Sequence, residues 1–127
     1  MVKLFAIGIG GFLGSISRYL ISGFVQDISR SVSFPYGTFA VNSIGCLMIG
    51  FVSQLAETKG FLPDLSRSFV IIGFLGGFTT FSAFGNETFN LLRDGETSLA
   101  LFNVAGQVIV CLAFVWFGRG IAHWIWG

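Results

Sequence analysis

The sequence predicts an all-α membrane protein with four transmembrane helices, the third of them broken. Its 127 residues are 54% hydrophobic and 10% charged, whereas soluble domains carry about 25% charged residues. The mean hydropathy is +0.83. A small soluble domain has too little interior to bury 16 Phe, because small domains bury a modest fraction of their surface. Lipid must therefore be the main solvent of these side chains.

Charged residues divide the chain into four stretches that are uncharged or nearly so. A helix needs about 20 apolar residues to cross the hydrocarbon core. We predict one domain over residues 1–127, with spans at about 4–26, 35–56, 68–92 and 97–124. These stretches do not alternate apolar and polar residues as the strands of a membrane barrel do, so helices are favoured. The connections are short, which places the function within the membrane.

The first span contains one ionisable residue, Arg18, and two glycines, Gly10 and Gly14, spaced four apart. Such spacing lets membrane helices approach closely. An ionisable residue within a span is a functional candidate. The alternative for Arg18 is that its long side chain reaches a lipid headgroup.

The second and fourth spans carry pairs of polar residues one helical turn apart. Thr38 and Asn42 form one pair, and Asn103 and Gln107 form the other. A carboxamide has donors and an acceptor that all need partners, and polar groups in hydrocarbon are costly without them. Either these residues bond neighbouring helices to one another, or they line a narrow and partly wet pathway.

The third span weakens its own helix in "GFLGGFTTFSAFGNETF", residues 73–89. Each Gly costs a helix about 1 kcal/mol relative to Ala. A break at membrane depth is tolerated in protein or beside a cavity, and it frees carbonyls that can hold a small cation. The alternative is that the glycines only permit close packing.

The same segment repeats phenyl rings and closes on Glu87. An aromatic ring has a positive edge, so the edges of Phe81 and Phe84 can favour an anion without trapping it. The alternative is that the rings face lipid. Glu87 is either functional or an interfacial residue at the end of a helix.

Several function classes are excluded. The net charge of +1 indicates no nucleic-acid surface. Cys46 and Cys111 lack metal-ligand spacing and are interpreted as small hydrophobic residues. The only histidine, His123, lies beside Trp124 and Trp126, which are typical of a membrane interface. We therefore predict that the chain is not an enzyme.

The distribution of basic residues gives almost no preferred orientation. One side of the membrane would carry four of them and the other three; these are Lys3, Lys59, Arg67 and Arg119 against Arg30, Arg93 and, if it reaches that side, Arg18. Orientation follows the excess of Lys and Arg. The near balance is either a weak bias or a sign of dual topology, in which copies insert both ways.

The chain resembles the Fluc family of small fluoride channels, also called fluoride exporters. The resemblance rests on "GxGGxxGxxxRY" from Gly8 to Tyr19, "PYGTFAVNSIG" at 35–45 and "GFLGGFTTFSAFGNET" at 73–88. It implies an antiparallel, dual-topology homodimer in the cytoplasmic (inner) membrane. It also implies passive and highly selective fluoride conduction that lowers cytoplasmic fluoride, and a structural Na⁺ at the dimer centre.

Carried onto this chain, the resemblance assigns the following roles. The carbonyls of Gly76 and Thr79 would hold Na⁺, and Arg18 would lie near a vestibule. The fluoride pathway would comprise Asn42, Phe81, Phe84, Thr38, Ser82, Asn103, Gln107 and Glu87. The fourth span departs from the family, because related chains often place Tyr and Ser along the face that here carries Asn103, Gln107 and Cys111.

Two other functions remain as alternatives. A proton-coupled exporter of cationic drugs needs a carboxylate in the membrane, and Glu87 is the sole candidate. A non-transporting assembly subunit would use its glycine motifs and carboxamides only to bind a partner.

Overall fold

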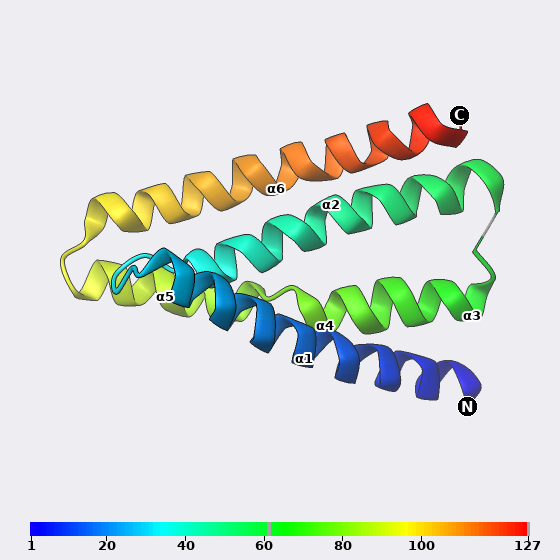
Figure 1. The fold of residues 1–127 in the computed structure, drawn as a ribbon, viewed down its shortest axis with the longest axis horizontal. Coiled ribbons are helices and arrows are strands. Elements are labelled where there is room, and N and C mark those ends of the chain that lie inside the picture. The colour runs from blue at the N-terminus through cyan, green and yellow to red at the C-terminus, as the bar shows by residue number, and fades with distance from the viewer. Residues whose placement is uncertain (61, 127) are drawn as a thin grey trace.

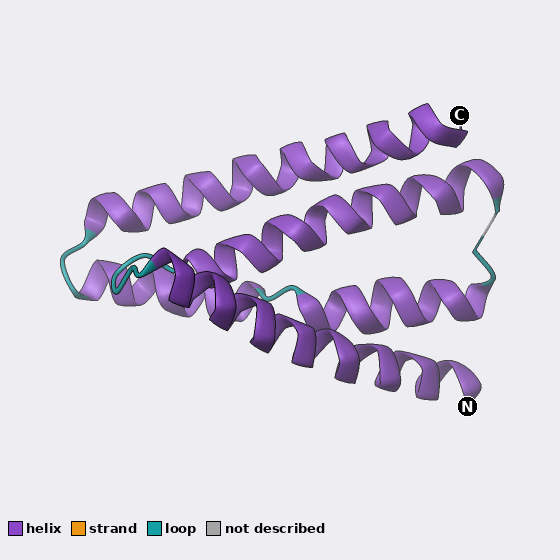
Figure 2. Ribbon diagram, viewed as in Figure 1, coloured by secondary structure: helices purple, strands orange, loops and turns teal. Residues whose placement is uncertain are grey.

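The computed structural model describes residues 1–60 and 62–126 as a bundle of helices, with no strand among them (Figures 1 and 2). Four helical stretches in this part of the chain are long and apolar enough to cross a membrane. The third is interrupted, which is compatible with the predicted break. The all-α prediction is therefore confirmed.

Three of the four spans are continuous helices. Helix α1 covers Val2–Ser29, α2 covers Tyr36–Lys59 and α6 covers Thr97–Trp126. Helix α1 stops at Arg30, whose φ of 53° is left-handed, and α2 stops at Gly60, with a φ of 55°. Glycine adopts this conformation without steric cost, and it ends many helices for that reason.

The third span, Asp64–Arg93, is built from four pieces. They are α3 (Asp64–Arg67), the π-helix η1 (Ser68–Leu75), α4 (Gly76–Phe78) and α5 (Phe81–Arg93). Thr79 and Thr80 separate α4 from α5 in extended conformations, with ψ of 157° and 111°. Figure 2 shows this break as a short loop inside the bundle. A π-helix is rare and often marks a functional region.

The helices pack as two close pairs. Helix α2 runs beside α6 in the same direction, and α1 packs on η1 and α4 (Figure 1). In the second pair the backbones touch, since a Cβ on Gly14 would lie 2.1 Å from the carbonyl oxygen of Phe74. The glycine spacing in the first span therefore serves close packing, as predicted from such motifs.

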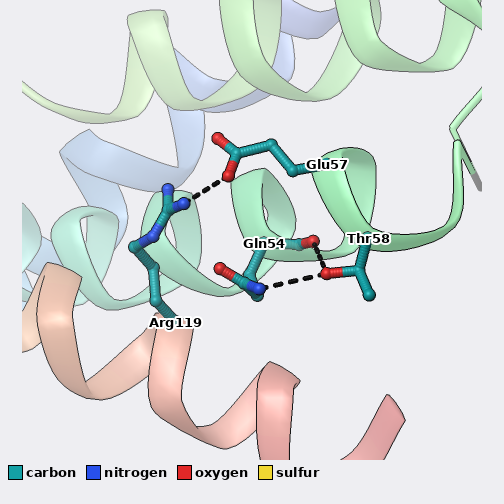
Figure 3. A network of polar contacts seen from close by, with 4 residues as sticks. All are labelled: Gln54, Glu57, Thr58 and Arg119. Carbon is teal, nitrogen blue, oxygen red and sulfur yellow. Dashed lines mark hydrogen bonds and ion pairs between the residues drawn. The ribbon is translucent and has the colours of Figure 1, made fainter. Parts of the chain in front are cut away.

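Both chain ends lie at the same end of the bundle (Figure 1), and exposed ion pairs lie in that region. Lys3 pairs with Asp64, joining α1 to α3. Arg119 on α6 pairs with Glu57 on α2, and the nearby Gln54 and Thr58 bond to one another (Figure 3). Exposed pairs of this kind contribute little stability, because water screens the attraction between the charges.

The interior is unusually polar. Among the described residues the buried polar side chains, Thr38, Asn42, Ser43, Ser68, Asn103 and Gln107, nearly match the buried apolar ones in number. Most large apolar side chains point outward. This arrangement suits a lipid environment, in which apolar groups gain nothing from burial and polar groups must find partners inside the protein.

Candidate functional site

The helix break is held by one side chain from another helix. The amide nitrogen of Thr80 donates to Oδ1 of Asn42 at 2.8 Å, and Nδ2 of Asn42 donates to the Thr80 carbonyl oxygen at 3.2 Å. Asn42 thus replaces both hydrogen bonds that Thr80 loses by leaving the helix. Gly45, one turn further along α2, lets the methyl group of Thr79 approach, since a Cβ there would lie 2.2 Å from it.

A chain of hydrogen bonds continues from Asn42 across to α6. Nδ2 of Asn42 also donates to Oε1 of Gln107 at 2.7 Å, and Nε2 of Gln107 donates to Oδ1 of Asn103 at 3.1 Å. Nδ2 of Asn103 then donates to Oγ1 of Thr88 on α5 at 2.9 Å. The structure therefore brings together three of the predicted residues, Asn42, Asn103 and Gln107.

Glu87 lies beside this chain with one oxygen satisfied and one not. Oγ1 of Thr38 donates to Oε1 of Glu87 at 2.6 Å. Oε2 is buried and has no hydrogen-bond partner among the described residues. A buried carboxylate oxygen without a donor is costly. Oε2 of Glu87 is therefore an acceptor for a hydrogen bond from a water molecule or another donor.

The two predicted phenyl rings lie next to one another at the start of α5. The ring centroids of Phe81 and Phe84 are 5.3 Å apart and the planes are tilted by 47°. Both rings line a cavity of about 480 Å³ together with Asn42, Thr79 and Gln107. The Phe81 side chain is 83% exposed in the single chain. The polar residues and the rings therefore share one space.

Another cavity, of about 570 Å³, is also lined by Thr80. Its lining includes Arg18, Thr38, Ser82 and Glu87. Ser82 is exposed, and its hydroxyl lies 3.3 Å from the hydroxyl of Thr80, which is its link to the polar network among the described residues. Arg18 forms no ion pair within 4.0 Å in the described part of the chain. Its side chain is thus a free cation beside the cavity.

Comparison with known proteins decides the family. Residues 5–119 match the family described as "CrcB-like protein, Camphor Resistance (CrcB)". The chain is 47% identical over 125 residues to the "Fluoride-specific ion channel FluC" of Geotalea daltonii, covering 98% of this chain and all of the relative. It is 44% identical over 123 residues to the protein of that name from Citrifermentans bemidjiense, covering 97% and 98%.

The chain belongs to the CrcB-like family. The resemblance found in the sequence motifs is therefore confirmed. The prediction that the chain is not an enzyme is also confirmed, because its CrcB-like relatives are named as ion channels. The four long apolar helices make this family member a multi-pass membrane protein.

The helix break in this CrcB-like chain offers suitable ligands for a hard cation. Among the described residues, no backbone hydrogen bond ends on the carbonyl oxygens of Gly76 or Thr79. The nitrogen of Thr80, which would bond Gly76 in a continuous helix, donates to Asn42 instead, and the nitrogen of Ala83, which would bond Thr79, donates to the Thr80 hydroxyl. Free carbonyl oxygens at a break are the groups that hold Na⁺ in membrane proteins. The two residues predicted for Na⁺ therefore fit such an ion.

Two residues of the network were not predicted as site residues. Thr80 supplies both backbone groups to Asn42 and also bonds the Ala83 nitrogen through its hydroxyl, at 3.2 Å. Thr88 accepts from Asn103 and donates to the carbonyl oxygen of Phe84 at 2.7 Å. Thr88 lies four residues after Phe84 and seven after Phe81, so helical spacing along α5 was the available signal.

Proposed function

We propose that the chain is a passive fluoride channel that selects fluoride over chloride and lets it leave the cytoplasm. The family and the names of its relatives support a fluoride channel. The main structural support is the hydrogen-bonded chain from Thr80 through Asn42 to Gln107. These three residues line the same cavity as the rings of Phe81 and Phe84. Polar side chains and two aromatic rings thus border one space between the spans.

The chemistry of fluoride suits this combination of groups. Fluoride is small and strongly hydrated, so a dry path must replace its water with hydrogen-bond donors. Carboxamide and hydroxyl groups can supply donors, and ring edges are weakly positive. None of these groups carries a full charge, so the ion is not held too tightly to leave. Larger and less strongly hydrated chloride gains less from the same donors.

Arg18 and Glu87 are proposed to act at the entrance and not at the rings. Both line the 570 Å³ cavity, which adjoins the 480 Å³ cavity at Thr80. A cation beside an opening raises the local concentration of anions. Thr38 would orient the Glu87 carboxylate through its hydrogen bond. We propose that Arg18 lies at the vestibule. The polar side chains of Thr38 and Ser82, which line the same cavity, would then lead the ion inward.

The working unit is proposed to be an antiparallel homodimer in the cytoplasmic membrane. The exposed Phe81 supports this, because a ring that borders the ion path should not face lipid. The 480 Å³ cavity is open in the single chain, and a second copy would close it. The near-equal counts of basic residues on the two sides also suit copies inserted both ways. Na⁺ between the Gly76 and Thr79 carbonyls would join the copies.

The proposed function is tested by ion efflux from liposomes that contain only this protein. A fluoride electrode records release after a valinomycin pulse, and a chloride electrode records parallel samples loaded with chloride. Rapid fluoride release with chloride retained supports a selective channel. If the protein elutes from size-exclusion chromatography as a folded dimer and releases neither ion, the proposed function is ruled out.

One observation favours the alternative of a proton-coupled exporter of cationic drugs. Glu87 has a buried oxygen without a partner, as a carboxylate that exchanges protons for substrate would need. Uptake of a lipophilic cation driven by a pH gradient, and lost in Glu87→Gln, would establish that function instead.

A further inference from the structure

Cys46 on α2 and Cys111 on α6 face one another across the seam between two parallel helices. One turn before them, Asn42 bonds Gln107. One turn after them, Gly50 packs against Val115 so closely that a Cβ would lie 2.2 Å from the Val115 carbonyl oxygen. All three pairs have the same separation of 65 residues. The contacts on both sides therefore bring the two cysteines together.

The thiols are close, free and accessible from one cavity. Both cysteines are unpaired and half-buried, and the contacts of the pairs before and after them place them at the same level of the α2–α6 seam. Both line the 480 Å³ cavity that also contains Phe81 and Phe84. The described residues contain no cluster of three His, Cys, Asp or Glu that could hold a metal. Two sulfur ligands, with no third metal ligand among the described residues, suit a metal ion that prefers two-coordinate binding.

The chemistry of such a pair selects a narrow class of ion. Thiolates are soft ligands and bind soft metals. Among soft ions, Hg²⁺, Ag⁺ and Cu⁺ accept two opposed sulfur ligands. Two thiolates neutralise a divalent ion completely, whereas a monovalent ion leaves one negative charge in the membrane. A buried charge is costly, so the divalent ion is preferred.

We propose that Cys46 and Cys111 form a two-thiolate site for a soft divalent cation such as Hg²⁺, and that an ion bound there obstructs the cavity beside Phe81 and Phe84. Neutral HgCl₂ crosses lipid and reaches the pair. Two S–H and two Hg–Cl bonds break, two S–Hg bonds form, and two protons and two chlorides leave to water. No electron is transferred. The binding needs no particular function of the chain, and only the obstruction rests on the proposed channel.

The binding is tested on the purified full chain with HgCl₂ alone. We expect one Hg²⁺ per chain, measured by elemental analysis after gel filtration, and protection of both thiols from alkylation by N-ethylmaleimide. Cys46→Ser and Cys111→Ser each leave one ligand. Because two linked ligands bind roughly 100-fold or more tightly than one, each variant should lose at least that factor in a competition with glutathione. Cys46→Ala and Cys111→Ala repeat the test without a hydroxyl.

Methylmercury is the matched control, since it accepts one thiolate and should bind two per chain with no advantage from the pair. Two Hg²⁺ per chain, or affinity unchanged by either serine substitution in folded protein, would overturn the site.

The obstruction is measured separately, as fluoride efflux of each protein relative to its own untreated rate. HgCl₂ should stop efflux through the unsubstituted chain, dithiothreitol should restore it, and the double serine variant should be insensitive. Unchanged efflux at full Hg²⁺ occupancy would overturn the obstruction but not the site, and absent efflux before HgCl₂ would count against the channel alone.

Discussion

Asn42 and Thr80 exchange two hydrogen bonds across the helix break, one in each direction, over 2.8 Å and 3.2 Å. The same Asn42 amide group also donates to Gln107 at 2.7 Å. One side chain therefore holds the broken helix open and begins the polar line to α6. This relationship links the local structure of the third span to the proposed path of the ion.

We predict that Asn42→Asp abolishes fluoride efflux. The carboxylate would remove both donors, face the oxygens of Thr80 and Gln107, and repel an anion. Loss of buried hydrogen-bond partners costs about 1–3 kcal/mol, so the thermal unfolding midpoint should fall as well. Efflux is read with a fluoride electrode. Gln54→Glu, which adds a charge to the same helix three turns away near Thr58, should conduct normally. Normal efflux through Asn42→Asp would remove Asn42 from the path.

We predict that Phe81→Ile and Phe84→Ile each reduce fluoride efflux strongly while the protein stays folded. Isoleucine fills similar space but has no positive ring edge. Folding should survive at position 81 because that side chain is 83% exposed in the single chain. Phe89→Ile is the control, since Phe89 is on the same helix but does not line the 480 Å³ cavity. Unchanged efflux in both variants would rule out the role of ring edges.

We predict that Gly14→Ala destabilises the protein, because a Cβ at that position would lie 2.1 Å from a backbone oxygen that cannot turn aside. Overpacking of this kind costs about 1–3 kcal/mol. The measurement is the thermal unfolding midpoint in detergent. Gly8→Ala is the matched control on the same helix, since nothing lies within 4 Å of its Cβ. Equal midpoints for the two variants would contradict the close packing of α1 on the third span.

We predict that replacing Na⁺ by N-methyl-D-glucamine lowers the stability of the dimer. A ligand at 100 times its Kd contributes about 2.7 kcal/mol, and the bulky organic cation cannot enter between carbonyl oxygens. Chemical cross-linking and unfolding midpoints in the two salts measure the effect. Identical values in both salts would argue against a structural Na⁺ at Gly76 and Thr79.

We predict that Glu87→Gln still conducts fluoride and shows no dependence on a pH gradient. The amide oxygen of Gln can accept the hydrogen bond from Thr38, so the polar track keeps its geometry. Efflux is measured with and without a pH gradient across the liposome. Transport that requires the gradient in the unsubstituted chain and stops in Glu87→Gln would favour a proton-coupled exporter.

Helical spacing predicted the polar pairs because it depends on local geometry alone. Asn103 and Gln107, one turn apart, do bond to one another. The role of Thr80 could not be predicted in this way, because its partner Asn42 is 38 residues away. The glycines and threonines indicated a break, but only the packing of α2 decides that it falls at Thr79 and Thr80. The π-helix over Ser68–Leu75 could not be predicted, because the segment is apolar apart from Ser68 and carries no distinguishing pattern.

The decisive measurement is fluoride efflux from liposomes that hold only this protein, with chloride-loaded liposomes measured in parallel. A selective fluoride channel should release fluoride rapidly and retain chloride, and Phe81→Ile and Asn42→Asp should lose the fluoride release. Folded dimers that release no fluoride, or that release fluoride and chloride alike, would contradict it.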